Sequence, residues 1–112
     1  MEKHEDDSLN FNITNTTDKI FLMRDFIQNN LLGFKSLREK DFLTSKKAYK
    51  KSLMIAQRLA DDEIKIVESY TNYGISSYFC GKFIEAKRNL EEAFKVSSKL
   101  FNDQKYSELI LQ

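Results

Sequence analysis

The sequence predicts an all-α protein built from antiparallel helix-turn-helix pairs. The chain of 112 residues contains no proline and only three glycines, a composition that favours long uninterrupted helices. Apolar residues recur at three-and-four spacing along most of the chain, as they do on the buried face of a helix. A shift of 41 residues also places Gly33 on Gly74 and Phe42 on Phe83. This self-alignment indicates that one helix pair occurs twice.

The first helix pair is expected after a polar N-terminal segment. Residues 1–17 are mostly charged or polar and predict a flexible leader. The apolar pattern then predicts helices at about 18–38 and 42–60, with Thr17 as the cap of the first helix. We therefore assign residues 18–60 to the first pair.

The second helix pair is expected at 61–101. Asp61 and Asp62 can accept hydrogen bonds from the free amides at the start of a helix, and they complement its positive dipole end. That helix should end near Phe79, and Gly81 permits a tight turn into the next one. Such short connections require neighbouring helices to lie antiparallel.

The last segment, 102–112, is expected to begin another helical element. Asn102 and Asp103 repeat the capping pattern that precedes the second pair. The apolar run Leu109–Leu111 would then belong to a helix that lacks a partner. We expect this apolar end to be covered by self-association or by a larger complex.

The 41-residue shift preserves side-chain size even where it does not preserve identity. Small residues such as Gly74 and Ala86 allow two helix backbones to approach, while large residues fill the space around them. The matched positions are Leu32 with Tyr73, Leu37 with Tyr78, Ser45 with Ala86, Tyr49 with Leu90, Ser52 with Ala93, and Leu53 with Phe94.

The second copy, from Tyr70 to Ala86 with a further alanine seven residues later, resembles the tetratricopeptide repeat signature. The first copy departs from it, with Asn29 in place of an aromatic residue and Lys40 in place of glycine. A period of 41 rather than 34 residues is similar to the long form found in kinesin light chains and LGN-type adaptors. The residues that carry the resemblance are Gly33, Phe42, Gly74, Gly81, Phe83, Ala86 and Ala93.

This resemblance implies a short right-handed superhelix of about two repeats plus part of a third helical element. In the family, the first helices of successive repeats line a concave groove that binds a peptide or helix of a partner protein. Asn72 matches an asparagine that lines the groove in the long form, whereas the first copy has Leu31 there. The groove residues that the resemblance implies are Asn30, Phe34, Arg38, Glu68, Thr71, Asn72, Ile75 and Phe79. The alternative for Phe34, Leu37, Ile75 and Phe79 is packing between repeats.

Residues for catalysis or metal binding are sparse. The single histidine, His4, lies in the leader, so no histidine-activated nucleophile or histidine metal cluster can form within one chain. Cys80 is also single and is interpreted as a small, partly buried apolar residue. Glu91 and Glu92 are interpreted as solvated helix surface. We therefore predict no catalytic residues, no metal site, no cofactor and no enzymatic activity.

The charge balance argues against nucleic acid and membranes as partners. The 18 basic residues are matched by 17 acidic ones, so the chain has no strong net field. No signal peptide or long apolar segment precedes the helices. The sequence therefore predicts a cytoplasmic protein that binds another protein or peptide.

Two other hypotheses stay open at this point. The chain can be a structural subunit or fragment of a large assembly, for example a cytoskeletal or ciliary one, held by its exposed helix ends. It can also be a regulatory appendage of an enzyme whose catalytic part lies elsewhere.

Overall fold

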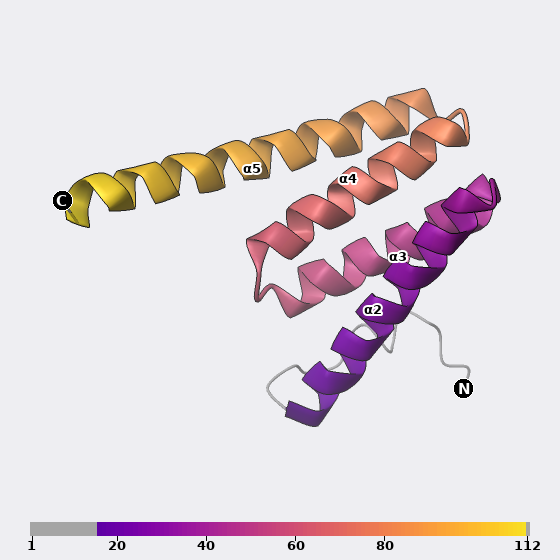
Figure 1. Cartoon of the computed structure of the whole chain (residues 1–112), viewed down its shortest axis with the longest axis horizontal. Helices are drawn as coiled ribbons and strands as arrows, with labels where there is room; N and C mark the ends of the chain where they lie inside the picture. The colour runs from indigo at the N-terminus through magenta and orange to yellow at the C-terminus, as the bar shows by residue number, and fades with distance from the viewer. Residues whose placement is uncertain (1–15, 112) are drawn as a thin grey trace, which may run out of the picture.

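The computed structural model describes the backbone of residues 16–111 and the side chains of residues 16–103, and this part of the chain is helical without any strand (Figure 1). The prediction of an all-α fold is confirmed. The helices are α2 (Thr16–Arg38), α3 (Phe42–Leu59), α4 (Glu63–Phe79) and α5 (Phe83–Leu111). Most of the predicted leader lies outside the described residues. Thr17 lies inside α2 and so does not cap it, a difference of the size that helix ends commonly show.

The helices lie side by side in chain order. Figure 1 shows α3 between α2 and α4, and α4 between α3 and α5. The main packing contacts join α2 with α3, α3 with α4, and α4 with α5. Each helix is therefore stabilised chiefly by its sequence neighbours, as expected for stacked helix pairs.

The two helix pairs turn in the same way. After α2, the Asp41 amide donates to the Ser36 carbonyl and the Lys40 amide donates to the Leu37 carbonyl. After α4, residues 82 and 81 donate to residues 77 and 78, at positions 41 residues later. This double hydrogen bond is the Schellman motif, which requires a left-handed residue. Lys40 (φ 63°) and Gly81 (φ 77°) occupy that position.

Aspartates begin α3 and α4. The Asp62 carboxylate accepts a hydrogen bond from the Ile64 amide at 2.9 Å, which confirms the predicted cap. The neighbouring Asp61 instead lies 3.2 Å from the Lys65 ammonium group. Asp41 caps α3 by accepting from the Thr44 amide, which lies three residues later, whereas Asp62 accepts from an amide two residues later.

Within each pair the helices approach closely at a glycine. A Cβ atom added to Gly33 would lie 2.8 Å from the Tyr49 ring, and one added to Gly74 would lie 2.7 Å from Leu90 Cγ. Both distances are far inside van der Waals contact. Tyr49 and Leu90 are matched by the 41-residue shift, so the two pairs use the same contact. In the first pair the Ser45 hydroxyl also donates to the Gly33 carbonyl at 2.8 Å.

The core contains two buried clusters. The first lies between α2 and α3, and Ile66 of α4 packs against it. Its buried members are Leu22, Phe26, Ile55, Ala56 and Leu59. The second joins α3 to α4 through Tyr49, Leu53 and Tyr73, with Tyr70 packed alongside. The second cluster therefore attaches one pair to the next.

The predicted helix boundary at residues 102–103 is wrong, because α5 continues from Phe83 to Leu111. Each of the three turns contains a residue with positive φ, namely Lys40, Ala60 or Gly81, and α5 has none. Asn102 and Asp103 only slightly disfavour a helix, so without such a turn the helix continues. The predicted self-association through Leu109–Leu111 concerns side chains outside those described.

The shared turn leads to a prediction about Lys40 and Gly81. The left-handed backbone conformation of Lys40 costs free energy because lysine has a Cβ atom. Lys40→Gly removes this cost and should stabilise the fold by about 0.5–1 kcal/mol. Gly81→Ala should destabilise it by about 1 kcal/mol, although no atom lies within 4 Å of the added Cβ, because the backbone conformation disfavours any side chain. Urea unfolding of the variants measures both changes. An unchanged Gly81→Ala variant would contradict the shared-turn explanation.

Candidate protein-binding site

The residues of the predicted groove lie along one side of α2 and the matching side of α4. We call this surface the α2–α4 face. Ile27, Phe34 and Arg38 of α2 are exposed, and so are Glu68, Ile75 and Phe79 of α4, each matched to the former by the 41-residue shift. Phe34 is 54% exposed and Phe79 is 49% exposed. The two helices thus place large apolar side chains in water at equivalent positions.

The N-terminal part of α4 contacts the core cluster between α2 and α3. Ile66 packs against the cluster that contains Leu22 and Phe26 of α2. The Lys65 ammonium group lies 5.3 Å from the centre of the Phe26 ring, within the range of a cation–π interaction. The main packing of α4 is with α3 and α5.

The polar residues of the α2–α4 face differ in their free hydrogen-bonding capacity. The Asn30 side-chain oxygen is buried and accepts no hydrogen bond, whereas the Thr71 hydroxyl already donates to the Val67 carbonyl at 2.8 Å. Asn72 is half-buried. The chain itself covers the Asn30 oxygen, so this atom is not accessible to a partner.

The aromatic residues of this face have different surroundings. Phe79 stacks on Phe42, with ring centres 5.1 Å apart, so for Phe79 the packing alternative holds in part. Phe34 instead has the Arg38 guanidinium 5.6 Å from its ring centre. Leu37 is half-buried and Ile75 is exposed. Phe34 and Ile75 are accordingly exposed apolar members for which no stacking on another ring is found among the described contacts.

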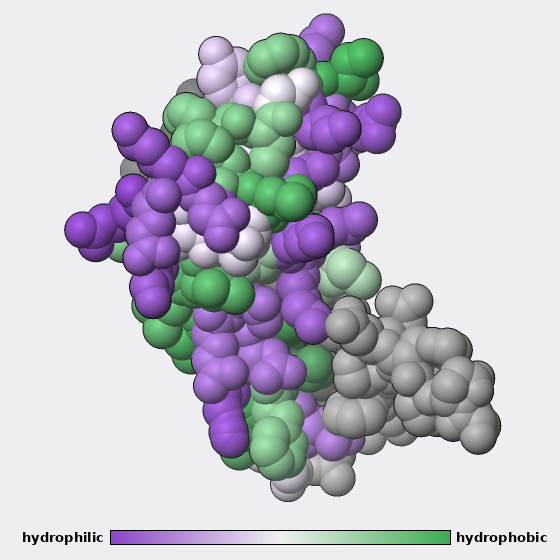
Figure 2. Space-filling view, turned by 90° about the vertical axis from the view of Figure 1, so that its right-hand side faces the viewer, coloured by the Kyte–Doolittle hydropathy of each residue, from purple (hydrophilic) through white to green (hydrophobic). Residues whose placement is uncertain are grey.

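A row of rings leads from the α2–α4 face towards α5. Tyr78 contacts Phe79 edge-on at 5.6 Å and Phe83 at 5.3 Å between ring centres. Figure 2 views the end of the molecule that carries the turns between α2 and α3 and between α4 and α5, and hydrophobic residues are visible at its surface. Tyr78 is not among the predicted groove residues. The 41-residue shift matches it to Leu37, which indicates only that both positions hold a large side chain.

Three hollows on the described surface lie outside the α2–α4 face. One of about 680 Å³ is lined mainly by α5 residues, including Phe83, Leu90 and Phe94. Another of about 590 Å³ lies beside Lys46 and Glu85. The third, of about 610 Å³, adjoins the turn between α3 and α4. None of the three is lined by the residues of the predicted groove.

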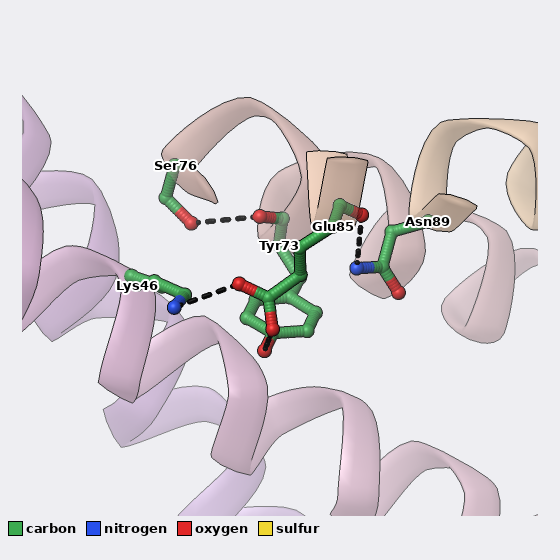
Figure 3. Close-up of polar contacts among 5 residues, drawn as sticks. All are labelled: Lys46, Tyr73, Ser76, Glu85 and Asn89. Carbon is green, nitrogen blue, oxygen red and sulfur yellow. Dashed lines mark hydrogen bonds and ion pairs between the residues drawn. The ribbon is translucent and has the colours of Figure 1, made fainter. Parts of the chain in front are cut away.

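Three helices are joined by a polar network around Glu85 (Figure 3). The Lys46 ammonium group of α3 lies 2.7 Å from one carboxylate oxygen of Glu85 on α5. The Tyr73 hydroxyl of α4 donates to the other oxygen at 2.8 Å. The Asn89 amide donates to the Glu85 carbonyl, and the Ser76 hydroxyl donates to the Tyr73 carbonyl. The sequence analysis did not find this network, whose members lie on three helices.

The network changes the acidity of its members. The hydrogen bond from Lys46 lowers the pKa of Glu85, partial burial opposes this, and the hydrogen bond from Tyr73 lowers the pKa further. Burial raises the pKa of Tyr73 well above its usual value, and the adjacent Glu85 carboxylate adds to this effect. Glu85 therefore stays ionised and Tyr73 stays neutral at neutral pH. Both states favour the observed contacts, which identifies the network as a connection between helices.

The lowered pKa of Glu85 leads to a prediction about stability. Because the folded-state value lies below the unfolded value of about 4.3, the stabilisation is present above that pH and is lost as the pH falls through the folded-state pKa. Glu85→Gln should lower the free energy of unfolding at neutral pH by about 1 kcal/mol. Urea unfolding at neutral pH and at about pH 3 measures the difference, which should shrink as the pH falls.

Glu91→Gln is the matched control, since Glu91 is an exposed glutamate of the same helix. It should leave stability unchanged at both pH values. An equal loss in Glu85→Gln at both pH values would show that the carboxylate charge contributes nothing.

Among the described residues, no cluster of three or more histidine, cysteine, aspartate or glutamate side chains could hold a metal ion. Within the same part of the chain, no helix has the length and apolar character needed to cross a membrane. Comparisons with protein-family models, with curated proteins and with solved structures found no match to this chain.

Proposed function

We propose that this chain is a non-catalytic protein-interaction module that binds a peptide or helix of a partner protein on the α2–α4 face. The observation that carries the proposal is the exposure of large apolar side chains, Phe34 and Ile75, at equivalent positions of α2 and α4. Solvated apolar side chains gain free energy when a partner covers them.

The chemistry of this face suits the side chains of a peptide. Phe34 and Ile75 can contact apolar side chains of a peptide. Glu68 and Arg38 are both exposed and carry opposite charges, so they can select the charge of the flanking residues.

We also propose that the chain is a long-form tetratricopeptide repeat protein whose stacked pairs continue as a right-handed superhelix. Two features support this assignment: the equivalent glycine contacts at Gly33 and Gly74, and the equivalent turns at Lys40 and Gly81. Repetition of both the packing and the turn is typical of proteins built from one duplicated unit.

A second candidate function is that of a structural subunit held in a large assembly by its exposed helix faces. It is favoured by the apolar residues that α5 exposes on its outer side, of which Phe94 is 74% exposed. Exposed apolar surfaces of this kind mark contacts with other proteins. The two candidates differ in which face holds the partner.

The peptide-binding proposal predicts the effect of removing two side chains. Peptides are first selected from a random library for binding to the full chain. Phe34→Ala combined with Ile75→Ala should weaken the selected binders by at least about tenfold, because it removes the two exposed apolar contacts. Fluorescence anisotropy with labelled peptides measures the dissociation constants.

Phe21→Ala is the matched control. Phe21 is also exposed on α2, and Arg24 lies 5.6 Å from its ring centre just as Arg38 does for Phe34. Phe21 lies on another side of the helix, so its replacement should leave binding unchanged. If the double variant kept full affinity for every selected peptide, the α2–α4 face would not be the binding site.

A further inference from the structure

The outer side of α5 carries a row of apolar residues that the described helices leave exposed in part or for the most part. We call Phe83, Leu90, Phe94 and Phe101 the α5 stripe. Their spacing of seven, four and seven residues places them on one side of the helix. Phe94 is 74% exposed and Phe101 is 65% exposed. A hollow of about 680 Å³ is lined by Phe83, Leu90 and Phe94 of this stripe and by Tyr78 of α4.

The equivalent side of α3 is covered by α4. The 41-residue shift matches Phe83, Leu90 and Phe94 to three residues of α3. Of these, Phe42 stacks on Phe79, while Tyr49 and Leu53 pack against Tyr73 of α4. Leu53 is only 6% exposed, in contrast to its equivalent Phe94. The first pair thus shows which kind of element covers this side of a second helix.

We propose that the α5 stripe is the docking surface for an amphipathic helix of a partner protein, and that this helix packs on α5 as α4 packs on α3. The contacting face of α4 defines its chemistry. Tyr70 and Tyr73 lie three residues apart and contact α3, and the small residues Ser69 and Ser76 are buried beside them. The partner helix therefore presents two aromatic residues about one turn apart, flanked by small residues that permit close approach.

The match between α3 and α5 also includes a basic residue. Lys46 of α3 lies 2.7 Å from the Glu85 carboxylate, which belongs to the helix that follows α4. Lys87 of α5 is the matched residue, and it is exposed at the edge of the 680 Å³ hollow. A carboxylate in the segment that follows the docked partner helix would take the place of Glu85 and pair with Lys87.

The α2 helix of a second copy lacks this chemistry. Its residues at the positions of Ile66, Tyr70 and Tyr73 are Asp25, Asn29 and Leu32. A head-to-tail stack of copies would bury Asn29 against Leu90 and Phe94, which is unfavourable for a polar group without a partner there. The α2 helix of a second copy is therefore a poor occupant, whereas a helix with the chemistry of α4 fits the stripe.

The test uses the sequence of α4 itself as the probe. A fluorescent peptide spanning residues 61–79 is titrated with the full chain, and binding is followed by anisotropy. The expected result is saturable binding that Phe94→Glu weakens by at least about tenfold, because a carboxylate would be buried in an apolar contact. The peptide variant Tyr73→Glu should also fail to bind. Phe94 is exposed, so its replacement leaves the fold intact, and Phe101→Glu provides a second variant.

Ile84→Glu is the control on the same helix. Its equivalent Leu43 remains 57% exposed although α4 covers its neighbours, so Ile84 lies outside the docked area and its variant should bind normally. Absence of peptide binding would overturn the proposal, and so would binding that survives Phe94→Glu and Phe101→Glu. Sedimentation of the full chain as a dimer that Phe94→Glu dissociates would overturn it as well, by assigning the stripe to a second copy. The α2–α4 face is on other helices, so none of these results bears on the peptide-binding proposal.

Discussion

The close approach of two helices at a glycine determines how each pair packs. At Gly33 and at Gly74 the backbone of the first helix lies against a large side chain of the second, leaving no space for a Cβ atom. This approach brings the buried small residues of both helices together, including Ser45 and Ala86 at equivalent positions. The direction of each second helix follows from that contact and from the turn that precedes it.

The stacking of one pair on the next depends on that geometry. The Tyr49 ring lies against Gly33 of α2, and together with Leu53 it also packs against Tyr73 of α4. The Tyr73 hydroxyl and Lys46 then bind opposite oxygens of Glu85, which connects the second pair to α3 through a charge. In the second pair Leu90 lies against Gly74 as Tyr49 lies against Gly33. Phe94, the match of Leu53, is exposed, because the described chain provides no equivalent of Tyr73 to cover it. An exposed apolar stripe is thus a direct consequence of the repeat.

The sequence predicted the helices and their turns well because the physical signals are local. Apolar spacing, the capping position of Asp62 and the flexibility of Gly81 each act within a few residues. The continuity of α5 was missed because a capping pattern also fits inside a helix when no left-handed residue precedes it. The network of Lys46, Tyr73 and Glu85 could not be predicted, since it depends on the orientation of three helices. The unsatisfied acceptor of Asn30 likewise became apparent only from its burial.

Unfolding of Gly74→Ala, alone and combined with Leu90→Ala, tests the role of the glycine contact most directly. Close packing predicts that Gly74→Ala destabilises the protein by about 1–2 kcal/mol, because overpacking outweighs the gain in helix propensity. It also predicts that the loss shrinks when Leu90 is already alanine, since the clash is with that side chain. If Gly74→Ala instead stabilised the protein by about 1 kcal/mol, as helix propensity alone requires, the helices would not depend on this approach.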